Sequence, residues 1–254
     1  MNILVLVKKV PDANLPEQFI SVSPDRSNVV LHSASQYSVN LYDLNAVELA
    51  LTLKEKHGGT VTVMTAGDIS AEQHLRRALS MGADRAVRVD VTSDILVDPH
   101  ATADAIAAAC RAAGPFSLIF AGRQASDTDA GLVPHAVAVA LGVPSMSPVV
   151  AVGDATDQSI AVGKLSEDTI DYYAMPLPAV LCVSNEINKP RVPSLKGVMA
   201  SKKVPVEVVQ SQSAAQPPTA TYAMKAAASK TAMPLIKDGS ADEKAAALLS
   251  ALGI

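Results

Sequence analysis

The chain has 254 residues, enough for one large domain or for one domain with a substantial extension. Hydrophobic residues make up 49% of it and charged residues only 18%, which excludes a globally disordered chain. The formal net charge of −4 gives no continuous basic surface, so we expect no nucleic-acid partner. No apolar run approaches the length of about 20 residues that spans a bilayer, so we expect no membrane insertion.

The first residues and the two cysteines indicate a reducing compartment. The N-terminal segment carries its charges after its apolar residues, unlike a signal peptide. Cys110 and Cys182 lie in apolar segments without a CxxC spacing, so neither a zinc site nor a disulfide is indicated. We therefore expect a cytoplasmic protein.

The first half of the chain alternates predicted strands and helices. Nearly unbroken apolar runs predict buried strands of a parallel sheet, at 2–10, 60–67, 85–90 and 116–122. After the first of them, two short apolar runs around a turn at 25–27 predict a hairpin. Such an alternation specifies a doubly wound sheet, whose ligands bind at the carboxyl ends of the strands.

Helices are predicted over 43–58, 70–82, 98–114 and 132–142. Asp43 should cap the first, and a capping box from Ser70 to Gln73 should open the second. Asp98 followed by Pro99 should open the third. The fourth helix is apolar almost all round, which predicts that it is buried.

After residue 145 the pattern changes to short runs at hairpin spacing. Antiparallel edge strands are predicted at 147–153, 158–165 and 169–175, and a last buried strand at 178–185. The chain should then leave the fold, pass through a polar linker at 211–220 and end in a helix with a capping box from Ser240 to Glu243. The expected fold is therefore α/β, with a mostly parallel sheet, an antiparallel extension and a C-terminal arm.

The sequence contains none of the catalytic or phosphate-binding motifs that such a sheet often carries. GxGxxG, GxxxxGK[ST], GxSxG and HExxH are all absent, and the five histidines lie on different predicted elements. We therefore expect no nucleophile paired with a histidine and no acid–base constellation.

One loop has the character of a binding site. GRQASDTDAG, at 122–131, follows the fourth predicted strand and opens directly into a helix, where free N–H groups and the helix dipole favour an anion. Gly122 and Gly131 would allow close backbone approach. Asp127 and Asp129 would repel a phosphate that they faced, so we expect them to cap backbone groups or bond ribose hydroxyls. An ordinary helix N-terminus explains the same residues equally well.

Two further loops should converge on the same edge of the sheet. TAGD, at 65–68, ends the second predicted strand, and VKKVPD, at 7–12, ends the first. Three loops at neighbouring carboxyl ends would form a crevice for an adenine nucleotide.

The chain resembles the β subunits of electron transfer flavoproteins, including those of FixA type, from residue 1 to about residue 209. The resemblance lies in VKKVPD, in YDLNAVELAL at 42–51, in GADRAVRV at 82–89, in GRQASDTDAGLVP at 122–134, and above all in LPAVLCVSNEINKPRVPSLKGVMASKK at 177–203. It implies an adenine-nucleotide-binding α/β domain over 1–209, with a recognition loop at 190–203. Residues 210–254 would then form a linker and a C-terminal arm.

The resemblance also implies an electron carrier component rather than a self-contained enzyme. Its partner would be an α subunit that holds a redox-active FAD, and its own site would hold AMP. In the electron-bifurcating alternative a second FAD replaces AMP and oxidises NADH. A rival from another class is a stand-alone adenine-nucleotide sensor of universal-stress type.

The expected nucleotide contacts come from the three loops and from one residue before the first helix. They are Val10, Pro11, Asn40, Thr65, Ala66, Gly67, Gly122, Arg123, Gln124, Asp127, Thr128, Asp129, Ala130, Gly131, Leu132 and Val133. The family loop typically reads Asp-Gly-Asp-Thr-Gly-Gln-Val-Pro, and this chain differs from it at Thr128, Ala130 and Leu132. Two side-chain phosphate donors are thereby lost, while the backbone amides of 129–133 are kept.

A short apolar triplet marks the expected recognition loop. Leu195, Val198 and Met199 fall at i, i+3 and i+4 on one helical turn. Their spacing alone favours a turn packed on its own subunit. The resemblance instead implies that Leu195 inserts into a pocket of partner flavin dehydrogenases.

Overall fold

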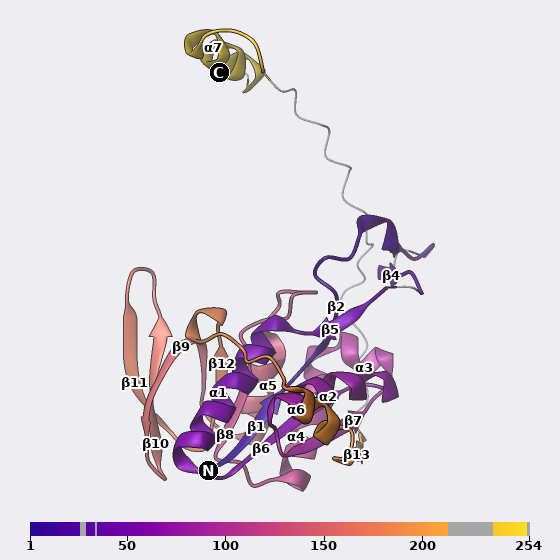
Figure 1. Cartoon of the computed structure of the whole chain (residues 1–254), viewed down its shortest axis with the longest axis vertical. Helices are drawn as coiled ribbons and strands as arrows, with labels where there is room; N and C mark the ends of the chain where they lie inside the picture. The colour runs from indigo at the N-terminus through magenta and orange to yellow at the C-terminus, as the bar shows by residue number, and fades with distance from the viewer. Residues whose placement is uncertain (26–28, 34, 213–235, 253–254) are drawn as a thin grey trace. The chain divides into compact units, whose positions relative to one another are not determined.

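The computed structural model describes residues 1–25, 29–33, 35–212 and 236–252 (Figure 1). By their internal contacts these residues divide into two units. One unit contains Met1–Phe19 and the chain from Ser33 through the large sheet. The other contains the hairpin of β3 (Ile20–Val22) and β4 (Val29–Leu31), and helix α7 (Ala241–Leu252). The pairing of β3 with β4 confirms the predicted hairpin. All but two residues of the expected linker at 211–220, and part of the hairpin turn, lie outside the described residues.

The described part of the first unit folds around a nine-stranded sheet, in the order β11-β10-β9-β12-β8-β1-β6-β7-β13. The strands are β1 (Asn2–Leu6), β6 (Thr60–Ala66), β7 (Arg85–Asp90), β8 (Leu118–Gly122), β9 (Ser145–Ala155), β10 (Ser159–Leu165), β11 (Ile170–Pro176), β12 (Ala179–Val183) and β13 (Val206–Gln210). In the sheet order, the strands from β9 through β12, β8, β1, β6 and β7 to β13 all pair in parallel. β10 and β11 extend the sheet beyond β9 with antiparallel pairings. The predicted fold class is confirmed.

Helices cover both faces of this sheet: α1 (Leu41–His57), α2 (Glu72–Met81), α3 (Ser93–Val97), α4 (Pro99–Ala113) and α5 (Leu132–Leu141). Successive side chains of a strand point to opposite faces. Ile3 and Val5 of β1 accordingly lie in the core with α1 and α2, whereas Leu4 and Leu6 lie in the core with α4 and α5. The sheet is therefore buried on both faces, as the apolar runs predicted.

β1 is central to the topology. From β1 the chain continues to β6 on one side, and after β7 it crosses back to β8 on the other side. Such a reversal opens a crevice at the carboxyl ends of the strands. β1 itself is shorter than predicted, because after Leu6 the chain turns into β2 (Lys9–Pro11), which pairs with β5 (Tyr37–Val39).

The predicted start of the first helix is wrong. α1 begins at Leu41 with Asn40 as its N-cap, and Asp43 lies inside the helix. The carboxylate of Asp43 accepts backbone N–H groups from other parts of the chain, namely those of Lys8 and Gly122. It therefore does not cap its own helix.

The capping box expected for α2 does not form. Ser70 lies in the short 3-10 turn η2 (Ile69–Ala71), where its N–H donates to the side chain of Asp68. The side chain of Gln73 bonds His74 instead of reaching back to Ser70. Asp68 therefore begins the turn that leads into α2.

Helix α5 is less buried than predicted. Along its described length only Val137 and Ala138 are fully buried, while Leu132 is 56% exposed and Val139 is 81% exposed. The helix packs on α4 and on the sheet with one side, so its apolar sequence is only partly explained by these contacts.

The chain does not leave the fold after β12, contrary to expectation. It passes through a 3-10 turn, η3 (Asn185–Ile187), and helix α6 (Leu195–Ser201), and returns as β13 at the edge of the sheet beside β7. Three valines in β13 explain its pairing. Helix α7 in the other unit begins with the predicted capping box between Ser240 and Glu243.

The start of α4 is confirmed and generates a stability prediction. The carboxylate of Asp98 accepts the N–H groups of His100 and Ala101 at 2.9 and 3.1 Å. Asp98→Ala should therefore lower the free energy of unfolding by about 1 kcal/mol. Chemical denaturation measures it, and Asp104→Ala, on an exposed turn of the same helix, is the control. Equal losses in the two variants would contradict the capping role.

Candidate functional site

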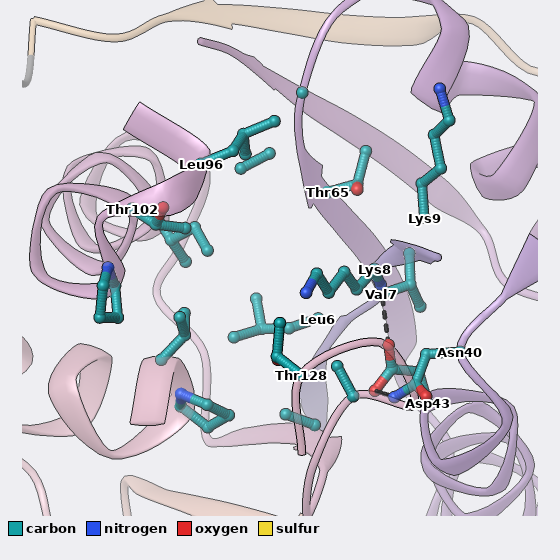
Figure 2. Close-up of a pocket in the computed structure, with 18 of the residues that line it drawn as sticks. Leu6, Val7, Lys8, Lys9, Asn40, Asp43, Thr65, Leu96, Thr102 and Thr128 are labelled. Carbon is teal, nitrogen blue, oxygen red and sulfur yellow. Dashed lines mark hydrogen bonds between the residues drawn. The ribbon is translucent and has the colours of Figure 1, made fainter. Parts of the chain in front are cut away.

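A cavity of about 580 Å³ opens where β1, β6 and β8 end (Figure 2). Most of the residues expected to bind a nucleotide line it together: Asn40, Thr65, Ala66, Gly67, Gly122, Gln124, Asp127, Thr128, Ala130, Gly131, Leu132 and Val133. Val10, Pro11, Arg123 and Asp129 do not line it. Val10 is buried in the β2–β5 pairing, which turns it away from the cavity.

A buried carboxylate joins three segments beneath the cavity. Oδ2 of Asp43 accepts the N–H of Lys8 at 2.7 Å, and Oδ1 accepts the N–H of Gly122 at 2.8 Å and the side-chain amide of Asn40 at 3.0 Å. Burial raises the pKa of Asp43 to about 7, although these donors and the charge of Lys8 oppose the rise. The ends of β1 and β8 are thus fixed to the first turn of α1.

Asn40 extends the same connection to the loop between β8 and α5. Its side-chain amide donates to the carbonyl of Gln124 at 2.8 Å, and its carbonyl oxygen accepts the N–H of Ser126 at 3.2 Å. Because Asn40 is only 1% exposed, these bonds form away from competing water. The polar contacts of Asn40 therefore set the shape of the loop.

The two loop glycines line the cavity and also allow close packing within the protein itself. A Cβ at Gly122 would lie 2.5 Å from Asp43 Oδ1 and 2.6 Å from Tyr42 Cβ. Gly131 has a φ of +62°, and a Cβ there would lie 2.8 Å from the carbonyl oxygen of Arg123. Glycine is needed at both positions so that the loop can close against α1 and against itself.

The two loop aspartates bind side chains, neither of which was expected. Asp127 Oδ1 lies 2.8 Å from the ammonium of Lys8, and Asp129 accepts from the side chain of Gln124 at 2.8 Å. Lys8 thereby neutralises the negative charge of Asp127 beside the cavity. The start of α5 lies directly after this loop, and its first N–H groups have no intrahelical acceptor.

The loop after β6 is fixed by Arg88, a residue that motif reasoning missed. The guanidinium of Arg88 is buried, donates to the carbonyl of Gly67 at 3.1 Å, and pairs with Glu72 and Asp90. Thr65 at the end of β6 lines the cavity, and its buried hydroxyl has no hydrogen-bond partner in the described structure. A ligand in the cavity would supply the partner that such a group requires.

One wall of the cavity is apolar. It consists of Leu6, Met64, Val91, Leu96, Val97 and Ile106. Part of this wall comes from α3, which the sequence did not predict because the helix is only one turn long. Ligand pockets are usually lined mainly by apolar side chains with a few polar groups, and this cavity has both.

A histidine lies beside a cysteine, a contact that the sequence did not predict. His135 Nε2 is 3.8 Å from Cys182 Sγ, and His135 Nδ1 is 2.9 Å from Ser145 Oγ. Burial, together with the charge of Asp43, raises the pKa of the Cys182 thiol to about 12. The thiol is therefore protonated at neutral pH and is not a nucleophile.

The apolar triplet of the expected recognition loop lies on α6 and is exposed. Leu195 is 81% exposed, and Met199 and Val198 are exposed as well. Ser194 caps the helix by accepting the N–H of Gly197 at 3.1 Å. The turn does pack on its own subunit, through Gly197 and Ser201 against α2, but the three apolar side chains stay exposed.

Comparisons with known proteins agree with this arrangement. A family profile described as the electron transfer flavoprotein domain matches residues 27–214. The electron transfer flavoprotein subunit beta of Thermoanaerobacterium thermosaccharolyticum is 36% identical over 198 residues, which cover 78% of this chain and 74% of the relative. That of Bacillus subtilis is 30% identical over 210 residues, covering 83% and 79%. Protein FixA of Azorhizobium caulinodans is 35% identical over 206 residues, covering 79% and 70%.

The buried carboxylate predicts an unusual pH dependence. The folded pKa of about 7 lies above the ordinary value of 3.8, so the folded chain binds more protons than the unfolded chain between these values. Asp43 should therefore reduce stability progressively as the pH rises from about 4 to 7, by at most about 1.4 kcal/mol per pH unit.

Asp43→Asn should remove this pH dependence, because the amide does not titrate. It should also cost about 1–3 kcal/mol at low pH, since it leaves the N–H of Lys8 without an acceptor. Denaturant unfolding at several pH values measures both effects, with Asp104→Asn as the exposed control. Parallel pH profiles for wild type and Asp43→Asn would contradict the account.

Proposed function

Because this chain belongs to the family of electron transfer flavoprotein β subunits and FixA proteins, we propose that it is the β subunit of an electron-carrying heterodimer. Its partner is an α subunit that holds FAD, and the pair carries electrons from flavin dehydrogenases to downstream acceptors. The stand-alone sensor of universal-stress type finds no support among the relatives. Within the described residues no helix is long and apolar enough to cross a membrane.

The crevice is proposed to hold an adenine nucleotide. The observation that carries this proposal is the convergence of three loop ends on one cavity at the reversal of the sheet, next to the start of α5. Thr65 supports it, because its buried hydroxyl lacks a partner. The phosphate would lie against the first amides of α5, and the base against the apolar wall.

AMP and FAD would give this site different roles. AMP supplies no redox chemistry and would act structurally, whereas FAD would supply a second redox centre. In either case the residues of the chain bind and orient the nucleotide: Asp43 and Asn40 hold the loop, and Lys8 offsets the charge of Asp127.

Helix α6 is proposed to be the contact site for dehydrogenases. Leu195 protrudes from a helix on which Val198 and Met199 are also exposed, and Lys202 and Lys203 follow the helix. A small apolar anchor of this kind suits a transient partner, because a single well-buried side chain can supply much of the affinity.

The first test is the nucleotide content of the heterodimer purified with its α subunit. Denaturation should release an adenine nucleotide from the β site at near-stoichiometric yield. AMP together with one FAD identifies the carrier, and two FAD identify the bifurcating alternative. Release of only the α-subunit FAD would contradict the proposed nucleotide site.

The second test replaces the apolar anchor. Leu195→Ala should lower the affinity for a partner dehydrogenase by about one to two decades, because burial of leucine stabilises a contact by about 1.5–3 kcal/mol. Electron transfer from that dehydrogenase should weaken accordingly. Nucleotide content and the thermal midpoint should not change. Val139→Ala, an equally exposed apolar truncation on α5, is the control. A lower midpoint with unchanged coupling would refute the recognition role.

A further inference from the structure

The segment that leads to α6 is fastened to helix α1 by side chains. The amide of Asn45 donates to the backbone carbonyl of Asn188 at 2.8 Å, and the amide of Asn188 donates to the backbone carbonyl of Asn45 at 3.0 Å. The two side chains also bond each other at 3.1 Å. This reciprocal pair fixes the chain shortly before it reaches the exposed apolar helix.

Three residues later, Arg191 makes a second and stronger attachment to α1. Its guanidinium bonds both carboxylate oxygens of Glu48, at 2.8 and 2.9 Å, and both of Glu55, at 2.6 and 3.3 Å. Its backbone N–H donates to Glu48 as well, at 2.9 Å. The hydrogen bonds that Arg191 donates to Glu48 and then to Glu55 raise the pKa of Arg191 further above its usual range. The planar fork of arginine allows both contacts at once, which a lysine cannot reproduce.

The other end of α6 is held on α2. A Cβ at Gly197 would lie 2.4 Å from the carbonyl oxygen of Ser80, so the two helices approach at backbone distance. Arg76 of α2 donates to the carbonyls of Ser201 at 2.5 Å and of Val204. The exposed anchor Leu195 thus lies between two fastened points, Arg191 on α1 and Ser201 on α2.

We propose that Arg191 is a positioning residue for partner recognition, which holds Leu195 in the geometry that a dehydrogenase pocket accepts. This inference rests on the proposed function of α6. Its physical basis is preorganisation: a side chain that is already held loses less conformational freedom on binding. Arg191 itself need not touch the partner, because its guanidinium is already hydrogen-bonded to Glu48 and Glu55.

This role differs from a contribution to folding. The Glu55 carboxylate is mostly exposed, so its half of the fork adds little to global stability, and the largely buried Glu48 pair joins α1 to a segment that lies outside the sheet. Loss of the fork should therefore free the segment between Asn188 and α6 without unfolding the sheet. The effect should appear in docking and be small in the thermal midpoint.

The experiment uses the intact heterodimer and one partner dehydrogenase, and it separates KM from kcat for electron transfer. Arg191→Gln should raise KM by about threefold to tenfold, the range expected when one or two side chains must be ordered on binding, with kcat nearly unchanged. Arg191→Lys keeps the charge but loses the fork, so it should resemble Arg191→Gln. Lys189→Gln removes the same charge two residues away and should resemble wild type.

Two further variants test whether the effect is specific to the Arg191 pair and whether it acts through Leu195. Arg85→Gln breaks a bidentate pair with Glu207, which joins β7 to β13 after α6 and does not involve α1, and it should leave KM unchanged. Arg191→Gln combined with Leu195→Ala should be no worse than Leu195→Ala alone, because a missing anchor needs no positioning.

The proposal is overturned if Arg191→Lys behaves as wild type, if Arg191→Gln lowers the thermal midpoint without changing KM, or if the two substitutions are additive. These failures are distinct from failure of the proposed function. If Leu195→Ala alone leaves electron transfer unchanged, α6 is not the recognition site. If Leu195→Ala weakens transfer and Arg191→Gln does not, only the positioning role is wrong.

Discussion

The buried carboxylate of Asp43 is the contact on which the geometry of the crevice depends. It accepts N–H groups from the end of β1 and the end of β8, and Asn40 continues the network to the loop before α5. Burying a carboxylate is costly unless its oxygens are hydrogen-bonded, and here both are. The interaction therefore specifies one arrangement of the ends of β1 and β8 and of the loop before α5, and a loop that moved would leave polar groups unpaired.

Helix α1 connects the crevice with the proposed recognition segment. Its first turn contributes Asp43 to the cavity, while Asn45, Glu48 and Glu55 further along hold the segment that leads to α6. One rigid element thus supports both surfaces. A nucleotide bound at the N-terminal end of α1 would stabilise the position of this helix. The same helix would then hold the recognition segment in place.

The fold was predictable because apolar runs of strand length alternate with capped helices, and local signals of this kind do not need long-range contacts. The helix start at Asp98 was found for that reason. Asp43 was misassigned because its acceptor role depends on Lys8 and Gly122, which are distant in sequence. Lys8 and Arg88 were missed for the same reason, since only folding brings each beside its partners. The exposure of Leu195 was expected only from the family resemblance, since its spacing alone favoured a buried turn.

An experimental structure of the chain bound to its α subunit tests the central claim most directly. The account predicts an adenine nucleotide in the crevice, with its phosphate against the first turn of α5 and with Asp43 and Asn40 holding the adjoining loop. A crevice filled by side chains of the α subunit, or a nucleotide bound elsewhere on this chain, would contradict it.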